Sequence, residues 1–297
     1  MIDWDAIAAA ISSATQQPFQ LGDHAAAGGG CINQTYRIRG LDHQQFFIKL
    51  NAADKHAMFA AEAEGLNTIA VTNTIRVPRP IVHGIAGKQS YLVLEHLELS
   101  SRGDAKLLGE QLAALHRCTS SRFGFFQDNF IGTTPQPNGW PNERIDSWID
   151  FWRERRLGFQ LRLAAQNGYG GQLQTLGEKL LDALPSFFVG YTPQPSLLHG
   201  DLWNGNHAFL ADGTPTIFDP ATYYGDRECD LAMTELFGGY PADFYAAYRA
   251  AYPLNAGYTT RRELYNLYHI LNHANLFGGG YARQAEQMMQ LLLSEVR

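Results

Sequence analysis

The chain has 297 residues, of which 45% are hydrophobic, and it carries a formal net charge of −6 at pH 7 with a pI near 5.9. This length exceeds a typical single domain, so two lobes are expected. The acidic balance argues against non-specific nucleic-acid binding, which needs clustered Lys and Arg. No stretch approaches the roughly 18 apolar residues of a membrane span, and the N-terminus lacks the pattern of a signal peptide. We therefore expect a cytoplasmic protein without membrane or nucleic-acid partners, either a monomer or a homodimer.

The first predicted elements are a helix at residues 3–16 and strands at residues 35–38 and 45–50, with a turn at 40–43 between the strands. A glycine-rich segment precedes the first strand. Glycines let backbone N–H groups approach phosphate oxygens, although three glycines in a row can equally form a flexible linker. The candidate phosphate-binding residues of this segment are Gly28, Gly29, Gly30, Cys31 and Asn33.

Lys49 lies in the second strand, where a lysine is placed to meet phosphates. The next segment, residues 58–70, has helical composition and carries Glu62 and Glu64. Positions two apart on a helix face different ways, so only one carboxylate is expected to point toward Lys49. We choose Glu62, which would hold the ammonium by a charge-assisted ion pair. Three residues of this helix are spaced for burial: Phe59, Leu66 and Ile69.

Further elements are predicted between the first lobe and the middle of the chain. Residues 76–80 are expected to form a proline-stiffened loop, residues 91–94 a strand, and residues 103–117 a helix with leucines spaced for burial. Residues 123–140, rich in Gly, Pro and Asn, are predicted as a loop that can wall an acceptor site. An aromatic and Arg-rich helix follows at 148–156, and we expect its aromatic residues in the core.

The segment HGDLWNGN at residues 199–206 is the most informative part of the chain. Asp201 and Asn206 match the kinase catalytic-loop pattern D-x-x-x-x-N, in which the Asp orients the attacking hydroxyl and the Asn reaches a metal ion. A structural turn is the alternative interpretation of HGD alone. The separate set of upstream residues, Lys49 and Glu62 with the glycine-rich segment, argues against that alternative.

Two short apolar runs follow, residues 208–210 and 216–218, joined by an Asp-Gly turn signal. Such a hairpin would return Asp219 to the neighbourhood of Asn206. Magnesium prefers oxygen ligands, takes one or two from protein, and completes its shell with water and substrate phosphates. The sequence therefore predicts Asn206 and Asp219 as its ligands.

Cysteine and histidine residues give weaker signals. The chain has three cysteines, Cys31, Cys118 and Cys229, without metal-ligand spacing, which fits a reducing compartment. Cys31 lies in the predicted phosphate loop, so its oxidation is a hypothetical inhibitory switch, with a small residue filling a tight loop as the favoured alternative. His269 and His273, four apart on a predicted helix, are expected to be packing residues rather than metal ligands, since no acidic or Cys partner stands nearby in sequence.

Five blocks of the sequence resemble the fructosamine kinase (ketosamine 3-kinase) family, in the aminoglycoside phosphotransferase-like branch of the protein-kinase-like fold. The blocks are GGGCINQTYRI, AEAEGLNTI with TIRVPRP, LLHGDLWNGN, FDPATYYGDRECDLAM and LYHILNHANLFGGGY. The resemblance covers nearly the whole chain. It implies a two-lobed α+β fold, with an antiparallel-sheet N-terminal lobe at residues 1–95 and a mainly helical C-terminal lobe at residues 96–297.

The resemblance implies transfer of the γ-phosphate of ATP to the 3-hydroxyl of a ketosamine, a sugar joined to an amine, after which the phosphorylated adduct becomes unstable and leaves. It makes Asp201 the catalytic base, Asn206 and Asp219 the Mg²⁺ ligands, and Lys49 with Glu62 the phosphate-positioning pair. It also implies that the segment after the strand at 91–94 offers hinge groups to adenine. The residues of that segment are Glu95, His96 and Leu97.

Candidate acceptor-site residues are Trp203, just after the catalytic loop Asp, and three residues that follow Asp219. A sugar ring stacks well on an indole, and its hydroxyls need polar partners. The three later residues are Tyr223, Arg227 and Glu228. The sequence departs from the family pattern at Asp226, where we associate His with the family, and this departure is expected to bear on substrate preference.

Two other functions stay open at this point. Kinases of other small hydroxylated molecules, such as aminoglycosides or choline, share the catalytic residues and differ in the acceptor pocket. A nucleotide-binding protein that has lost catalysis is the third alternative, and the presence of the full catalytic set argues against it.

Overall fold

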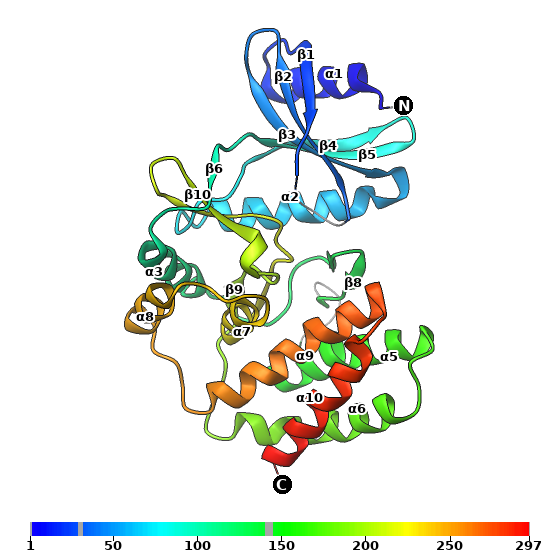
Figure 1. The fold of residues 1–297 in the computed structure, drawn as a ribbon, viewed down its shortest axis with the longest axis vertical. Helices are drawn as coiled ribbons and strands as arrows, with labels where there is room; N and C mark the ends of the chain where they lie inside the picture. The colour runs from blue at the N-terminus through cyan, green and yellow to red at the C-terminus, as the bar shows by residue number, and fades with distance from the viewer. Residues whose placement is uncertain (1, 29–31, 140–144, 297) are drawn as a thin grey trace. The chain divides into compact units, whose positions relative to one another are not determined.

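The computed structural model describes residues 2–28, 32–139 and 145–296, which form two compact units. Unit 1 consists of Met1–Asp104 together with His207–Pro220, and unit 2 consists of Ala105–Asn206 together with Ala221–Arg297. The structure therefore groups a short later segment with the N-terminal part of the chain (Figure 1). Within the described residues, no helix is long and apolar enough to cross a membrane.

Unit 1 is built on a five-stranded antiparallel sheet with the strand order β1-β2-β3-β5-β4. The strands are β1 (Leu21–Ala26), β2 (Gln34–Gly40), β3 (Gln45–Ala52), β4 (Pro80–Ala86) and β5 (Gln89–Glu95). The central strands β3 and β5 are buried over most of their length, as near-continuous apolar runs predict. The strands predicted at 35–38, 45–50 and 91–94 are confirmed within β2, β3 and β5.

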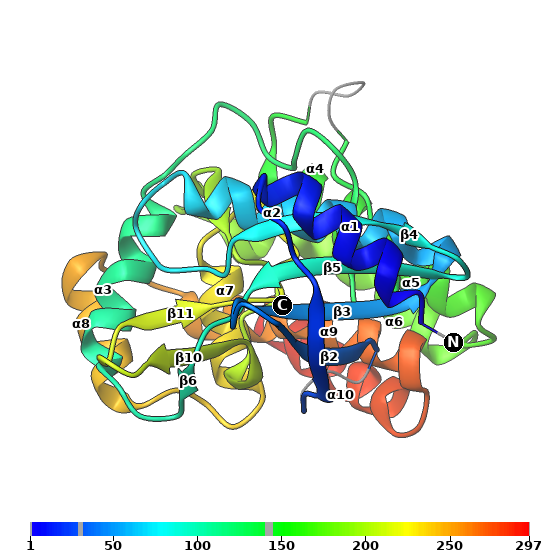
Figure 2. The same cartoon turned by 90° about the horizontal axis from the view of Figure 1, so that it is seen from above.

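Helices α1 (Trp4–Thr15) and α2 (His56–Ala70) cover opposite faces of this sheet (Figures 1 and 2). On the α1 face, Ile7 and Ile11 join a buried cluster that includes Ile48 of β3. Successive strand residues point to opposite faces, so the neighbouring Lys49 points toward α2, which follows the short helix η1 (Ala53–Lys55). The predicted apolar face of α2 is confirmed by the burial of three residues: Phe59, Leu66 and Ile69.

A second sheet of unit 1 has the order β11-β10-β6 and consists of β6 (Leu99–Ser100), β10 (His207–Leu210) and β11 (Pro215–Ile217). The predicted hairpin is confirmed, with Asp212 accepting a hydrogen bond from the backbone of Thr214 and Gly213 at φ +85° in the turn. A bridge between Arg76 and Thr216 also ties β11 to the earlier part of the unit. These pairings explain why the segment that ends just past Asp219 belongs to unit 1.

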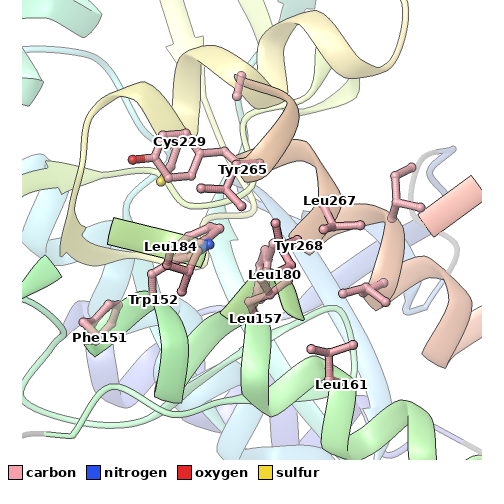
Figure 3. Packing of buried hydrophobic residues seen from close by; sticks show 14 of the residues in the cluster. Phe151, Trp152, Leu157, Leu161, Leu180, Leu184, Cys229, Tyr265, Leu267 and Tyr268 are labelled. Atoms are coloured by element: carbon pink, nitrogen blue, oxygen red, sulfur yellow. The ribbon is translucent and has the colours of Figure 1, made fainter. Parts of the chain in front are cut away.

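Unit 2 is mainly helical. Its helices are α3 (Ala105–His116), α4 (Trp148–Phe151), η2 (Trp152–Leu157), α5 (Gly158–Gln166), α6 (Gln172–Ala183), η3 (Leu184–Phe188), η4 (Asn204–Asn206), α7 (Glu228–Leu236), α8 (Ala242–Ala251), α9 (Tyr258–Phe277) and α10 (Tyr281–Glu295). Its short strands form two pairs, β9 (Ser196–Leu198) with β12 (Tyr223–Gly225) and β7 (Asn129–Ile131) with β8 (Thr134–Gln136). The core contains the predicted aromatic residues Trp148, Phe151 and Trp152, part of a cluster that Figure 3 shows around α5, α6 and α9.

One prediction in this unit needs correction. The segment 123–140 was expected to be a loop, whereas it contains the β7–β8 hairpin. The hairpin is stabilised by buried polar side chains rather than by an apolar pattern, because Gln136 Nε2 donates to Asn129 Oδ1 at 2.8 Å and both residues are buried.

Candidate active site

Lys49 is the centre of the polar site in unit 1. Its Nζ donates to Glu62 Oε1 at 2.6 Å and to Asp219 Oδ1 at 2.5 Å. The Lys49 side chain is 4% exposed, whereas the Asp219 side chain is 40% exposed, so the carboxylate reaches solvent and the ammonium does not. The structure brings Glu62 rather than Glu64 to this lysine.

The charges around Lys49 shift its pKa and that of its partner. Burial alone would lower the pKa of Lys49, but the carboxylates of Asp219 and Glu62 outweigh burial and raise it, so the ammonium stays charged. Burial raises the pKa of Glu62 to about 7, against the lowering effect of the Lys49 ammonium. This site therefore holds a fixed positive charge beside one exposed carboxylate, which suits phosphate and a divalent cation.

Asp219 adopts an unusual backbone conformation with φ +60°. A non-glycine residue in the left-handed region is uncommon, and Asp and Asn tolerate it better than most other residues. Such conformations cost roughly 1–3 kcal/mol and cluster at functional sites. Asp219 shares this conformation with three other non-glycine residues among the described parts of the chain, Gln16, His43 and Asn73.

The catalytic-loop sequence lies in unit 2, where it follows β9 and ends with η4. Asn206 is buried, and its Nδ2 donates to the backbone oxygen of Asp201 at 2.8 Å and to Asp201 Oδ2 at 3.4 Å. These bonds fix the amide nitrogen and leave Asn206 Oδ1 as the atom suited to a cation. The backbone N–H of Asp201 donates to Nδ1 of the buried His199 at 3.2 Å. The predicted D-x-x-x-x-N pair is thus linked by its own hydrogen bonds.

Asp230 of α7 accepts hydrogen bonds from the backbone of this loop. The sequence analysis did not identify it as a functional residue. Its Oδ2 accepts from His199 N at 2.7 Å, and its Oδ1 accepts from Gly200 N at 2.8 Å. His116 Nε2 lies 3.1 Å from the same Oδ2. Burial would raise the pKa of Asp230, but the hydrogen bond and charge of His116 and the bond from Gly200 outweigh it and lower the pKa. The sequence signal that could have identified Asp230 is the presence of one acidic residue in the otherwise apolar run CDLAM at residues 229–233.

Gly200 shows why the loop needs glycine. Its φ is +84°, and a Cβ at this position would lie 2.1 Å from the backbone oxygen of Ala221. That oxygen belongs to a residue whose own N–H donates to His199 O at 2.8 Å. Any larger residue at position 200 would therefore push apart the two backbone segments that carry Gly200 and Ala221.

The predicted nucleotide-binding residues are distributed over unit 1. Gly29, Gly30 and Cys31 lie outside the described residues. Gly28 is exposed, with no atom within 4 Å of a would-be Cβ, and Asn51 Nδ2 of β3 donates to Asn33 Oδ1 at 2.8 Å.

The predicted hinge residues are half-buried and lie at the end of β5 and just after it. Glu95 is tied into the sheet, since its N–H donates to Arg79 O at 2.9 Å and its Oε1 accepts from Arg79 N at 2.7 Å. Burial lowers the pKa of His96, and Leu97 follows it before β6.

The four predicted acceptor residues lie in different environments. Trp203 is 39% exposed and next to the catalytic loop. Tyr223 is buried with the Arg156 guanidinium 4.0 Å from its ring centre. Glu228 is fully buried in an ion pair with Arg261, with an oxygen–nitrogen distance of 2.7 Å. Arg227 is buried and donates to Tyr248, Tyr252 and Pro253. Of this set, the structure brings Trp203 alone to an exposed position.

The histidines of α9 are packing residues in this structure. Burial is the main cause that lowers the pKa of His269 to about 3. His273 Nδ1 lies 2.8 Å from His269 O, and its ring contacts three aromatic residues: Phe237, Phe277 and Tyr281. The His269 ring packs against Tyr268, with ring centres 5.1 Å apart, so both imidazoles have protein contacts that fit a helix in the core.

A strand lysine paired with a helix glutamate, followed by a D-x-x-x-x-N loop and a strained aspartate, defines a phosphotransferase of the protein-kinase-like class. The fructosamine kinase family model matches residues 3–295, and the chain belongs to this family. The predicted family and the two-lobed α+β class are confirmed, and the protein is an enzyme of the kinase type.

Two relatives of known name agree with this assignment over most of the chain. A probable ketoamine kinase from Synechocystis sp. is 50% identical over 294 residues, which cover 98% of this chain and 97% of that protein. The chloroplastic protein-ribulosamine 3-kinase of Arabidopsis thaliana is 43% identical, over 88% of this chain and 79% of that protein.

Solved structures agree as well. A fructosamine-3-kinase homologue from Haemophilus somnus has a TM-score of 0.88 at 30% identity, over 98% of this chain and 97% of that chain. A macrolide 2′-phosphotransferase from Brachybacterium faecium, at 16% identity and a TM-score of 0.56 over 97% of each chain, shares the fold alone.

Proposed function

We propose that this protein transfers the γ-phosphate of ATP to the 3-hydroxyl of ketosamines, the adducts of sugars with free or protein-bound amines. Such a reaction destabilises the adduct and makes the protein a deglycation enzyme. The observation that carries the proposal is the family match along nearly the whole chain, together with an intact set of phosphotransfer residues. Fructosamine and ribulosamine adducts are the expected acceptors.

We assign the proton-handling role to Asp201. Phosphoryl transfer requires little covalent chemistry from the protein, so the carboxylate mainly aligns the acceptor hydroxyl and takes its proton as the new bond forms. The hydrogen bonds from Asn206 and to His199 hold Asp201 in one orientation, which supports this role. Lys49, fixed by Glu62, would hold the phosphate oxygens of the nucleotide.

The donor set fits a magnesium ion that is bound with the nucleotide. Asn206 Oδ1 and the exposed carboxylate of Asp219 are hard oxygen ligands, and the cation would neutralise phosphate charge when bound. Among the described residues, no group of three or more His, Cys, Asp and Glu side chains forms a metal cluster.

The location of the protein belongs to the same proposal. We place the activity in the cytoplasm, and the free thiols of Cys118 and Cys229 support this because reducing compartments keep cysteines unpaired. Cell fractionation tests the location: recovery of the protein with an extracytoplasmic fraction would contradict it.

The test is an ATP-consumption assay with mass-spectrometric detection of product. Synthetic fructosamines and ribulosamines are compared with an aminoglycoside and with choline, and the Asp201→Asn enzyme serves as the control. We expect phosphate to be added to the ketosamines by the unmodified enzyme, with Asp201→Asn reducing kcat by about 10² to 10⁴ while ATP still binds. Product confined to the aminoglycoside or choline would refute the substrate, and near-normal turnover of Asp201→Asn would refute the assigned base.

A further inference from the structure

A π-helical turn, η2, interrupts the helical segment between α4 and α5, and none of the roles above is assigned to it. The N–H of Gly158 donates to the oxygen of Arg153, five residues earlier, which is the hydrogen bond that defines such a turn. π-helical turns are rare and frequently occur at functional sites. Of the charged residues in this turn, Arg156 alone is buried, and it is buried fully. The turn therefore brings one charged side chain into the interior of unit 2.

Arg156 is held in the interior by hydrogen bonds and a ring contact. Its Nη1 donates to Pro137 O at 2.7 Å, and its Nη2 donates to Asn138 Oδ1 at 2.7 Å. Its guanidinium also lies 4.6 Å from the centre of the Phe151 ring. Within the described parts of the chain, no Asp or Glu side chain forms an ion pair with it. A guanidinium is costly to bury without a carboxylate, so an apolar side chain would serve packing better. The donors of Arg156 therefore point to a role beyond packing.

The hydrogen bonds of Arg156 enter a network of three buried carboxamides in and just after the β7–β8 hairpin. The carboxamides belong to Asn129, Gln136 and Asn138. Asn138 Nδ2 donates to Asn129 Oδ1 at 3.1 Å, and Gln136 Nε2 donates to the same oxygen at 2.8 Å. Gln136 Oε1 accepts from Tyr268 Oη at 2.7 Å. Every oxygen and nitrogen of the three carboxamides has a partner, and a fully satisfied buried network is rigid.

The other end of the network reaches the segment beside the catalytic loop. Asn129 Nδ2 donates to Thr222 O at 2.7 Å, and Gln136 Nε2 donates to Ala221 O at 3.1 Å. Ala221 N in turn donates to His199 O at 2.8 Å, at the start of the catalytic loop. One continuous series of hydrogen bonds therefore joins the π-helical turn to that loop.

We propose that Arg156 is a positioning residue for the kinase reaction, acting through the three carboxamides on the loop that carries Asp201. A guanidinium can only donate, so it satisfies Asn138 Oδ1 and Pro137 O without competing for the donors that reach residues 221–222. Without the guanidinium, both oxygens lose this donor, which favours a shift of the hairpin away from that segment. The loop would then hold Asp201 in a wider range of positions. The proposal rests on the kinase activity with Asp201 as its base.

Steady-state kinetics of Arg156→Met tests the effect on turnover, with the acceptor that the unmodified enzyme phosphorylates. A displacement of about 1 Å can cost about 10² in rate, so we expect kcat to fall by about 10- to 10²-fold. The KM for ATP is expected to stay within about twofold, because Lys49 lies outside the network. Arg156→Lys retains a charged donor and is expected to lose only about threefold in kcat.

Asn138→Asp breaks the network one step further along and leaves Arg156 in place. The new carboxylate gives the guanidinium an ion-pair partner. It also replaces the donor to Gln127 O and Asn129 Oδ1 with a second oxygen. We therefore expect kcat to fall by at least about tenfold, although the charge of Arg156 is better balanced than before.

Arg153→Met is the matched control. Arg153 belongs to the same π-helical turn, but its guanidinium donates to Asp150 and to the backbone oxygen of Leu181 instead of the hairpin. We expect this variant to retain the kcat and the ATP KM of the unmodified enzyme.

Amide hydrogen exchange detects loosening of the network without turnover. In Arg156→Met and Asn138→Asp, exchange is expected to accelerate at residues 129–136, 199–203 and 221–223, while α10 of the same unit stays protected. A purely structural role would accelerate exchange in α10 as well. The measurement therefore separates positioning from general stability, and it does not depend on which acceptor the enzyme uses.

Four results would overturn the proposal. An unchanged kcat in Arg156→Met would remove the positioning role, and an equal loss of kcat in Arg153→Met would remove its specificity. Accelerated exchange throughout unit 2, α10 included, would make Arg156 a general structural residue. An unchanged kcat in Asn138→Asp would show that Arg156 does not act through the carboxamides. If the unmodified enzyme phosphorylated no ketosamine, the proposed substrate would fail, and hydrogen exchange would still decide the role of Arg156.

Discussion

Lys49 supplies the positive charge that pairs with both acidic groups of the unit 1 site, Glu62 and Asp219. Its ammonium lies within 2.6 Å of Glu62 and 2.5 Å of Asp219, so it separates two carboxylates that would otherwise repel each other. Removing one partner of a buried ion pair typically costs about 3–5 kcal/mol, because the other charge stays buried and unpaired. Asp219 is partly exposed and is therefore screened by solvent. The loss of stability on removing the Lys49 ammonium is therefore determined mainly by the buried Glu62.

The first prediction concerns Lys49→Met and its pH dependence. We expect the free energy of unfolding to fall by about 3 kcal/mol at pH 8 and by less at pH 6. The pKa of Glu62 is raised in the fold to about 7 from its ordinary value of 4.5, and loss of the ammonium raises it further. A raised carboxyl pKa gives stability that is present at low pH and lost as pH rises through the folded pKa. Urea unfolding at pH 6, 7 and 8 measures the deficit.

Glu62→Gln supplies the control for this prediction. Added to Lys49→Met, it removes the unpaired carboxylate, so the double variant is expected to regain part of the lost stability and to lose the pH dependence. If the loss in free energy of unfolding of Lys49→Met stays constant from pH 6 to pH 8, the unpaired Glu62 carboxylate is not its cause.

The second prediction concerns Gly200→Ala in the catalytic loop. The new Cβ would meet Ala221 O in addition to the strain of φ +84°, so we expect a kcat at least about 10² lower. Gly190→Ala is the matched control, because Gly190 has φ +72° but no atom within 4 Å of the Cβ position. The control should lose about 1 kcal/mol of stability and keep its turnover. Equal loss of turnover in both variants would rule out the steric explanation.

Sequence reasoning at the scale of single residues succeeded where local geometry decides. Positions two apart on a helix face different ways, so only one of Glu62 and Glu64 was expected at Lys49. Glu62 was chosen, and the structure has Glu62 there. The contact between Lys49 and Asp219 joins residues 170 positions apart, and no local pattern encodes it. The role of Asp230 was missed because its partners are backbone N–H groups, which every sequence contains.

At the scale of elements, α7 and the catalytic loop form one functional piece. The third prediction is that Asp230→Asn lowers kcat by about 10² or more, since the amide presents only one acceptor oxygen to two backbone N–H donors. Steady-state kinetics and thermal unfolding measure the effect, with the exposed Asp243→Asn of α8 as the control.

The pH dependence of that variant distinguishes it from Lys49→Met. The pKa of Asp230 is lowered in the fold, so its stabilising effect is present above the ordinary value of 3.8 and is lost only as pH falls below that value. The stability deficit of Asp230→Asn should therefore be the same at pH 6 and pH 8. A deficit that disappears at pH 6 would contradict the proposed ionised anchor.

Elements with a strong apolar period were predictable, and those held by polar side chains were not. Helix α2 and strands β3 and β5 follow the apolar patterns expected of them. The β7–β8 hairpin has strands of only three residues each, and buried amides such as that of Asn129 hold it in place. The Gly, Pro and Asn residues of this segment are equally compatible with a hairpin and with an irregular loop, so its composition did not reveal the hairpin.

At the scale of the whole molecule, the chain folds into two units that each contain a hydrophobic cluster of their own. The cluster of unit 1 includes Ile7 and Ile11 of α1, and that of unit 2 includes Leu180 of α6. The order of the chain does not reveal that His207–Pro220 belongs to unit 1, because β10 pairs with β6 across more than a hundred residues. Long-range strand pairing of this kind has no local sequence signal.

The last prediction follows from these separate clusters. Ile11 and Leu180 are both fully buried, and truncating either to Ala should cost about 2–5 kcal/mol. If each cluster stabilises its own unit, Ile11→Ala will accelerate amide hydrogen exchange in β2, β3 and β5 while α9 stays protected, and Leu180→Ala will do the reverse. Exchange mass spectrometry on both variants makes the comparison, with each variant serving as the control for the other. Uniform acceleration throughout the chain in both variants would instead show that the two units unfold as one cooperative structure, and the active-site residues of each would then share a single stability.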